Sequence, residues 1–96
     1  MYAAIRQVKA KPGMENALRE RLKGAVAVVS NVPGFMNYYV VYSSDDTLTA
    51  ISIFNTVEQA EESNRRALAW IEKYLAGMVV GPASATAGPV IAHAAA

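Results

Sequence analysis

Apolar and polar residues alternate with two different periods along the chain, and the changes of period mark out six expected elements. A period of two residues indicates a half-buried strand, and apolar residues every three to four positions indicate an amphipathic helix. The expected order is strand, helix, strand, strand, helix, strand. The expected ranges are residues 2–9, 14–29, 35–42, 48–54, 56–76 and 83–93.

Glycine, proline and polar residues separate these elements. Thr56 and Gln59 fit a capping box, in which two side chains satisfy backbone groups at the start of a helix. The Gly-Pro pair at 81–82 is expected to interrupt regular secondary structure before the last strand. A second Gly-Pro pair, at 88–89, falls within that strand and implies an edge position or a bulge.

The order of the elements defines the fold class. A βαββαβ chain forms an α+β, ferredoxin-like fold, in which a four-stranded antiparallel sheet carries two helices on one face. The length of 96 residues suits a single domain. We expect residues 1–93 to form this domain and the tail at 94–96 to fray.

Neither face of the expected sheet is polar. In the strand at 35–42, Tyr39 and Val41 point to one face, whereas Tyr38 and Val40 point to the other. Two helices can cover only one face, and an uncovered apolar face is an interaction surface. The simplest partner is a second copy related by a two-fold axis. We therefore expect a homodimer through the open sheet face.

Composition agrees with a large buried surface and excludes several classes of function. Hydrophobic residues make up 53% of the chain, above the ~45–50% of an average domain. Absence of cysteine excludes thiolate metal sites and cysteine nucleophiles. A formal net charge of +1 argues against a nucleic-acid partner. With no membrane-length apolar stretch and no signal-like start, we expect a cytoplasmic protein with no membrane partner.

No cluster of residues indicates a metal or a cofactor. Asp45 and Asp46 are adjacent in an expected hairpin, where carboxylates commonly cap backbone donors. The single histidine, His93, lies near the chain end. No catalytic triad or phosphate-binding glycine loop is present. We therefore expect no metal and no cofactor.

The helix expected at 56–76 carries the candidate site. Asn64 lies in the middle of its apolar stripe, four residues before Leu68. A buried amide without partners costs roughly 1–3 kcal/mol. Asn64 is therefore either a satisfied amide bonded to a strand or a ligand-binding amide in a pocket between helix and sheet. Trp70 lies on one flank, where it covers the edge of the stripe or the dimer seam, or walls a pocket for a planar ligand.

Five short segments connect the chain with a known family. They are Lys11-Pro12-Gly13, Val32-Pro33-Gly34-Phe35, Ile53-Phe54, Ala69-Trp70 and Thr86-Ala87-Gly88. With these segments the chain resembles, over nearly its whole length, the antibiotic-biosynthesis-monooxygenase-like (ABM) domains of the dimeric α+β barrel superfamily. The resemblance implies dimers in which two sheets face each other as a barrel. It also implies a cavity between sheet and helices in each subunit.

Some ABM members oxidise polycyclic phenols or quinols with O2, without metal, flavin or haem, because the carbanion of the substrate itself reduces oxygen. The resemblance therefore implies a cofactor-independent monooxygenase acting on a small aromatic quinol or phenol. Asn64 would hold a substrate oxygen, and Trp70 would wall the ring. Tyr39 or Arg6 would stabilise the phenolate. Leu68 would contribute to substrate binding.

Two other groups of ABM members bear on the expected function. Members that degrade haem use a histidine on the second helix as iron ligand, and this helix has none, so that branch is rejected. Many other relatives have no established activity. The alternative function is therefore a non-catalytic, dimeric small-molecule binding or stress-response protein of the same fold.

Overall fold

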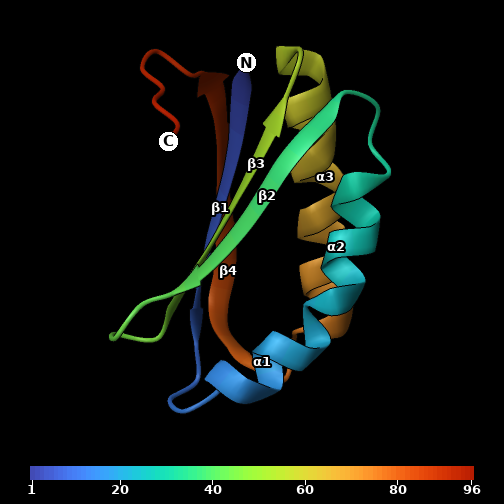
Figure 1. Ribbon diagram of the computed structural model, residues 1–96. Coiled ribbons are helices and arrows are strands. Elements are labelled where there is room, and N and C mark those ends of the chain that lie inside the picture. The colour runs from blue at the N-terminus through green and yellow to red at the C-terminus, as the bar shows by residue number, and fades with distance from the viewer.

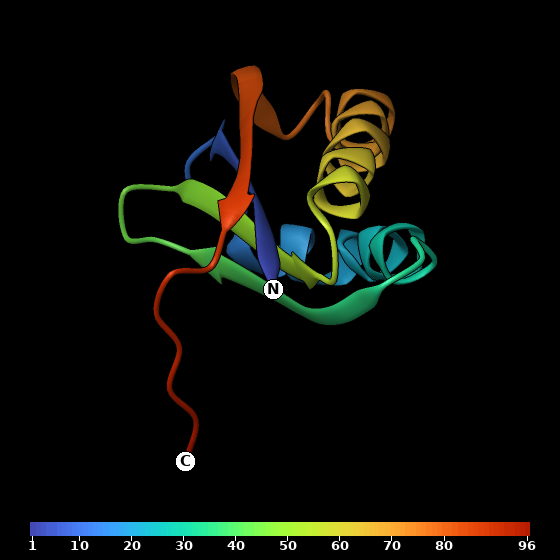
Figure 2. The same ribbon diagram turned by 90° about the horizontal axis from the view of Figure 1, so that it is seen from above.

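Four strands and three helices form two layers in the computed structural model, which describes residues 1–96 (Figure 1). The elements are β1 Tyr2–Ala10, α1 Glu15–Arg21, α2 Lys23–Ser30, β2 Phe35–Tyr42, β3 Thr47–Phe54, α3 Val57–Tyr74 and β4 Val79–Pro89. The strands pair antiparallel in the order β2-β3-β1-β4. All helices lie on one side of the sheet (Figure 2). The ferredoxin-like α+β fold expected from the element order is confirmed.

The first helical segment is interrupted, although its apolar spacing predicts one helix at 14–29. Leu22 ends α1 and begins α2 with backbone angles of φ −68° and ψ −10°. The Leu22 N–H donates to the carbonyl of Leu18 at 2.8 Å, and the Val26 N–H donates to the carbonyl of Leu22 at 3.1 Å. Hydrogen bonding thus continues across the junction, and the apolar spacing does not reveal the interruption at Leu22.

The last strand begins and ends earlier than expected, so the range 83–93 is wrong. The Gly-Pro pair at 81–82 lies inside β4 instead of before it. Gly81 adopts φ +75°, and the pairing of β1 with β4 shifts register between Gln7 and Lys9. The pair therefore makes an irregularity within a strand. Beyond Pro89, the tail leaves the sheet and extends away from the body (Figure 2).

Two clusters of buried apolar side chains fill the layer between the sheet and the helices. One consists of Val8, Ala10, Leu18, Ala25, Leu48, Trp70 and Leu75. The other consists of Ala4, Val29, Val32, Phe54, Ala60 and Ala67. Along β1, Arg6 separates Ala4 of the second cluster from Val8 of the first. A charged side chain therefore stands where the two parts of the core meet.

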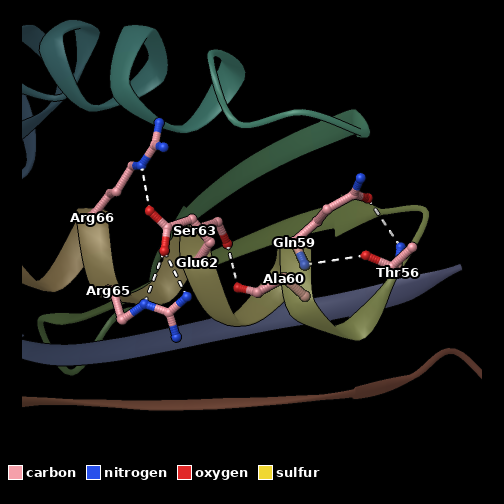
Figure 3. A network of polar contacts seen from close by, with 7 residues as sticks. All are labelled: Thr56, Gln59, Ala60, Glu62, Ser63, Arg65 and Arg66. Carbon is pink, nitrogen blue, oxygen red and sulfur yellow. Dashed lines mark hydrogen bonds and ion pairs between the residues drawn. The ribbon is translucent and has the colours of Figure 1, made fainter.

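Helix α3 begins at the expected capping box, which is confirmed (Figure 3). The Gln59 N–H donates to Thr56 Oγ1 at 3.2 Å, and the Thr56 N–H donates to Gln59 Oε1 at 3.1 Å. One turn further on, Glu62 accepts hydrogen bonds from Arg65 and Arg66 on the exposed side of the helix. These bonds lower the pKa of the Glu62 carboxyl, with the larger effect from Arg66.

The sheet face away from the helices carries apolar side chains. Tyr39, Ile51 and Ile5 are paired neighbours across β2, β3 and β1, and they form a row over the middle of this face. Tyr39 is 57% exposed and Val41 50% exposed. None of the helices is both long enough and apolar enough to cross a membrane.

Candidate functional site

Arg6 is the centre of the candidate site. It lies on β1 between two apolar core positions, so the strand directs its side chain toward the helices. The residue is only 1% exposed. Its Nη1 donates to Asn64 Oδ1 at 3.0 Å, and its Nη2 donates to Ser52 Oγ at 2.7 Å. A guanidinium is therefore held between β1, β3 and α3 by two neutral acceptors.

Asn64 joins the same network from α3. While its Oδ1 accepts from Arg6, its Nδ2 donates to the carbonyl oxygen of Thr86 on β4 at 2.9 Å. Asn64 is 7% exposed. The structure confirms the first of the two expectations, a satisfied buried amide bonded to strands. The same bonds also fix the orientation of the Arg6 guanidinium.

The charge of Arg6 has no anionic partner. None of the four ion pairs in the structure involves it, and its Nε is buried without a hydrogen-bond partner. The Tyr38 ring lies 5.7 Å from the guanidinium carbon, a cation–π distance. Burial lowers the pKa of Arg6, and Tyr38 opposes that effect. Because an unpaired buried charge is costly, this arrangement suits a site that receives negative charge.

Tyr38 is the tyrosine of the site. Its ring shares the helix-covered face with Val40 and Tyr42, both of which line the groove described below. Burial raises the pKa of the Tyr38 hydroxyl, and the nearby Arg6 charge opposes the rise. The sequence pattern places Tyr38 and Tyr39 on opposite faces. It does not tell which face the helices cover, because both faces are apolar.

A small cavity of about 20 Å³ adjoins Arg6. Its side walls come from β1, β2, β3, α3 and the α1–α2 junction. The lining residues are Arg6, Gln7, Val8, Leu22, Tyr38, Leu48, Ala50, Ala67 and Ile71. Seven of these nine are hydrophobic. The cavity is too small for an aromatic ring and large enough for one very small molecule.

A larger groove of about 400 Å³ lies beside the small cavity, between the first two helices and the β2–β3 hairpin. This volume is in the range of small-molecule sites, ~300–1,000 Å³. Its apolar lining consists of Leu18, Leu22, Val26, Val40, Tyr42 and Leu48. Glu15, Arg19 and Lys23 also line it. Leu22 and Leu48 line both spaces, so these two side chains form a shared wall between the groove and the Arg6 cavity.

The other expected site residues lie apart from Arg6 and Asn64. Tyr39 points to the opposite face of the sheet, because neighbouring strand residues alternate. Leu68 lines a separate groove between α3 and β4. Trp70 is 9% exposed and packs in the core, where a Cβ at Gly24 would lie 3.2 Å from its Cζ2. Trp70 lines neither the Arg6 cavity nor the larger groove.

Ser52 and Tyr38 are the site residues that the sequence did not single out. Ser52 occupies a core position of β3 and is fully buried. A hydroxyl among inward-facing apolar residues is the signal that could have found it, since buried polar groups need partners. The partner of Ser52 is Arg6, the one charged residue on the helix-facing side of β1.

The turn carboxylates have the structural role expected of them. Asp45 Oδ1 accepts from the Thr47 N–H at 3.1 Å, and Asp46 Oδ1 accepts from the Gly13 N–H at 3.3 Å. Asp46 adopts φ +65°, which fits a tight turn. No group of three or more histidine, cysteine or acidic residues is arranged to hold a metal ion.

Fold and site together define the class of protein: a small α+β protein with its polar network between a four-stranded antiparallel sheet and the covering helices. The chain belongs to the antibiotic biosynthesis monooxygenase family, whose model matches residues 1–67. The resemblance expected from the five short segments is thereby confirmed. Among proteins with curated functions, no sequence matches the chain.

Three solved structures illustrate the likeness in fold. A protein of unknown function, NE2512 from Nitrosomonas europaea, has a TM-score of 0.78 and 18% identity, covering 99% of this chain and 93% of its own. MhuD, solved with two manganese protoporphyrin IX molecules per active site, has a TM-score of 0.76 and 18% identity, covering 100% of both chains. SnoaB, a cofactor-independent oxygenase from Streptomyces nogalater, has a TM-score of 0.73 and 9% identity, covering 96% and 94%. These identities establish the fold alone.

Proposed function

We propose that the protein is a cofactor-independent monooxygenase that oxidises a small phenol or quinol with O2. Membership of the antibiotic biosynthesis monooxygenase family supports the general class, and SnoaB, which is similar in fold, is a cofactor-independent oxygenase. The substrate lies in the groove of about 400 Å³, where apolar walls bind the ring.

The observation that carries the proposal is the buried charge of Arg6. It has only neutral acceptors, and one buried N–H without a partner. In an interior of low dielectric constant, a fixed charge acts over several ångströms and favours a nearby anion. Arg6 therefore favours ionisation of a phenol bound on the other side of the wall formed by Leu22 and Leu48.

The reaction needs no cofactor to balance. The ionised phenol carries electron density on a ring carbon that bears hydrogen. The substrate gives four electrons to one O2 molecule, and this C–H carbon becomes a carbonyl carbon. One oxygen atom enters the product, and the other leaves as water with the two hydrogens that the substrate loses. A phenol thus gives a quinone, and a quinol gives a hydroxyquinone.

Each polar residue of the site has a defined task in this proposal. Arg6 supplies the positive potential. Asn64 and Ser52 hold the guanidinium in place, so Asn64 is a positioning residue and binds no substrate oxygen directly. Tyr38 takes the role first given to Tyr39. Trp70 supports the packing of α2 on α3, and Leu68 belongs to the neighbouring groove.

The alternative is a non-catalytic small-molecule binding protein. One observation favours it: Asn64 Oδ1 and Nδ2 are already hydrogen-bonded to Arg6 and Thr86. Such a protein would bind aromatic ligands in the larger groove and consume no oxygen. The same experiment separates the two functions.

Oxygen consumption with a panel of phenols and quinols tests the proposal. We expect uptake that depends on protein, and a loss on the order of a hundredfold in Asn64→Ala, because a displaced charge no longer matches the developing anion. Asn55→Ala, an exposed amide in the loop after β3, is the matched control and should keep full activity. Circular dichroism confirms that both variants fold. Binding without uptake by the wild type would favour the alternative.

We also propose that two copies pair through the open sheet face. The row of Tyr39, Ile51 and Ile5 gives this face an apolar centre, and exposed apolar patches of this kind commonly mark interfaces. A two-fold axis would place this row against its own copy.

A further inference from the structure

The cavity of about 20 Å³ beside Arg6 is separate from the groove that takes the aromatic ring. Room for one water molecule requires ~10–15 Å³, so this cavity admits a single diatomic molecule and excludes a ring. Its walls include the side chains of Val8, Ala50, Ala67 and Ile71. Leu22 and Leu48 line both this cavity and the groove. A small apolar molecule held there would lie next to a bound substrate.

A water molecule would find few polar partners in this cavity, because seven of the nine lining residues are hydrophobic. A buried water usually makes about three hydrogen bonds. The Gln7 side chain is bonded to Thr49 on the exposed face, which leaves Arg6 and Tyr38 as the polar side chains of the lining. Apolar cavities tend to stay dry and take up apolar gases instead. Dioxygen has the size and the low polarity that the cavity requires.

We propose that this cavity is the dioxygen site and that Arg6 stabilises the superoxide formed in it. The buried guanidinium of Arg6 lines the cavity and has no anionic partner, so it provides a positive charge where a negative charge develops. The anion appears only during the reaction. This timing explains why Arg6 has no permanent carboxylate partner.

The electron movement is balanced without a further reactant. One electron passes from the phenolate in the groove to O2 in the cavity, which gives a phenoxyl radical and superoxide. Recombination forms the carbon–oxygen bond, and loss of water then yields the carbonyl product. This superoxide step rests on the proposed oxygenase function, whereas occupancy of the cavity by dioxygen does not.

Paramagnetic relaxation by dissolved O2 tests occupancy without any turnover. Methyl groups of Ala50 and Ala67 line the cavity, whereas Ala4 and Ala60 are buried alanines that do not line it. Under oxygen pressure, NMR should show severalfold stronger relaxation of the Ala50 and Ala67 methyls than of the Ala4 and Ala60 methyls. Equal relaxation of all four, or a water contact at the Ala67 methyl, would overturn the dioxygen site.

Filling the cavity tests its part in the reaction. Ala67→Val adds two methyl groups to the wall, and Ala69→Val makes the same change at an exposed position of α3. We expect a severalfold higher KM for O2 in Ala67→Val, an unchanged KM for the phenol, and no change in Ala69→Val. An unchanged KM for O2 in a folded Ala67→Val protein would contradict the assignment. If no phenol is oxidised at all, the proposed function fails, and the relaxation experiment still decides the cavity.

Discussion

At the scale of single residues, the site depends on a conflict between charge and burial. Arg6 costs free energy as an unpaired buried cation, yet Asn64 and Ser52 hold it in one orientation. Asn64 could be predicted from the sequence, because an amide within an apolar stripe must find partners. The identity of its partners could not, because Arg6 lies 58 positions away along the chain, and only the sheet register brings the two together.

Tyr38 gives the site a measurable pH dependence. Burial raises the pKa of its hydroxyl above the ordinary value of 10.0. From pH 10 upward the unfolded chain loses this proton while the folded protein keeps it, so the free energy of unfolding falls. Below pH 10 this contribution is fully present. We expect urea unfolding between pH 9 and 11 to show a shallower decline in Tyr38→Phe than in the wild type. Identical declines would contradict the burial of this hydroxyl.

At the scale of elements, some features could be predicted from neighbouring residues in the sequence and others could not. The capping box of α3 is a local signal and was predicted to the residue. The break at Leu22 was not predicted, because backbone hydrogen bonds continue across it and the apolar spacing does not change. The spacing of apolar residues also did not predict the burial of Trp70. A helical wheel shows one apolar stripe, whereas α3 packs against the sheet on one side and against α2 on another.

The turn before β2 should be coupled to the start of α3 through one glycine. Gly34 adopts φ +81°, and a Cβ at this position would overlap Gln59 Oε1. Gly34→Ala should therefore lose about 1–2 kcal/mol for the left-handed backbone and about 1 kcal/mol more when Gln59 gives up its bond to Thr56. Chemical denaturation measures the loss.

Gly13→Ala is the matched control for this prediction, because Gly13 has φ +75° and a Cβ at this position would meet no atom within 4 Å. It should lose only the backbone contribution. Equal losses in the two variants would show that Gln59 moves aside without cost.

At the scale of the whole molecule, the surplus of apolar residues predicted an uncovered apolar face, and the sheet topology shows which face the helices leave open. Six elements in ferredoxin-like order were predictable because hydrophobic periods and turn residues are local. Which sheet face the helices cover was not predictable, since both faces are apolar. Tyr39 was assigned to the site for this reason, and Tyr38 occupies it instead.

Light scattering tests the proposed dimer. We expect a particle of twice 10.3 kDa for the wild type at micromolar concentration. Ile51→Glu places a charge at the centre of the open face and should give a monomer, because burying an unpaired carboxylate is unfavourable. Ala69→Glu, on the exposed side of α3, should leave the dimer intact. A wild-type particle of 10.3 kDa would refute the pairing.

The proposed reaction is the oxygenation of a phenol or quinol by O2 with no cofactor. Isotope labelling tests it most directly, by mass spectrometry of the product formed from a phenol under ¹⁸O₂ by purified protein without added metal, flavin or haem. We expect one labelled oxygen atom in each product molecule and the other in water. Absence of labelled product from every phenol and quinol tested, with the protein folded and binding them, would contradict it.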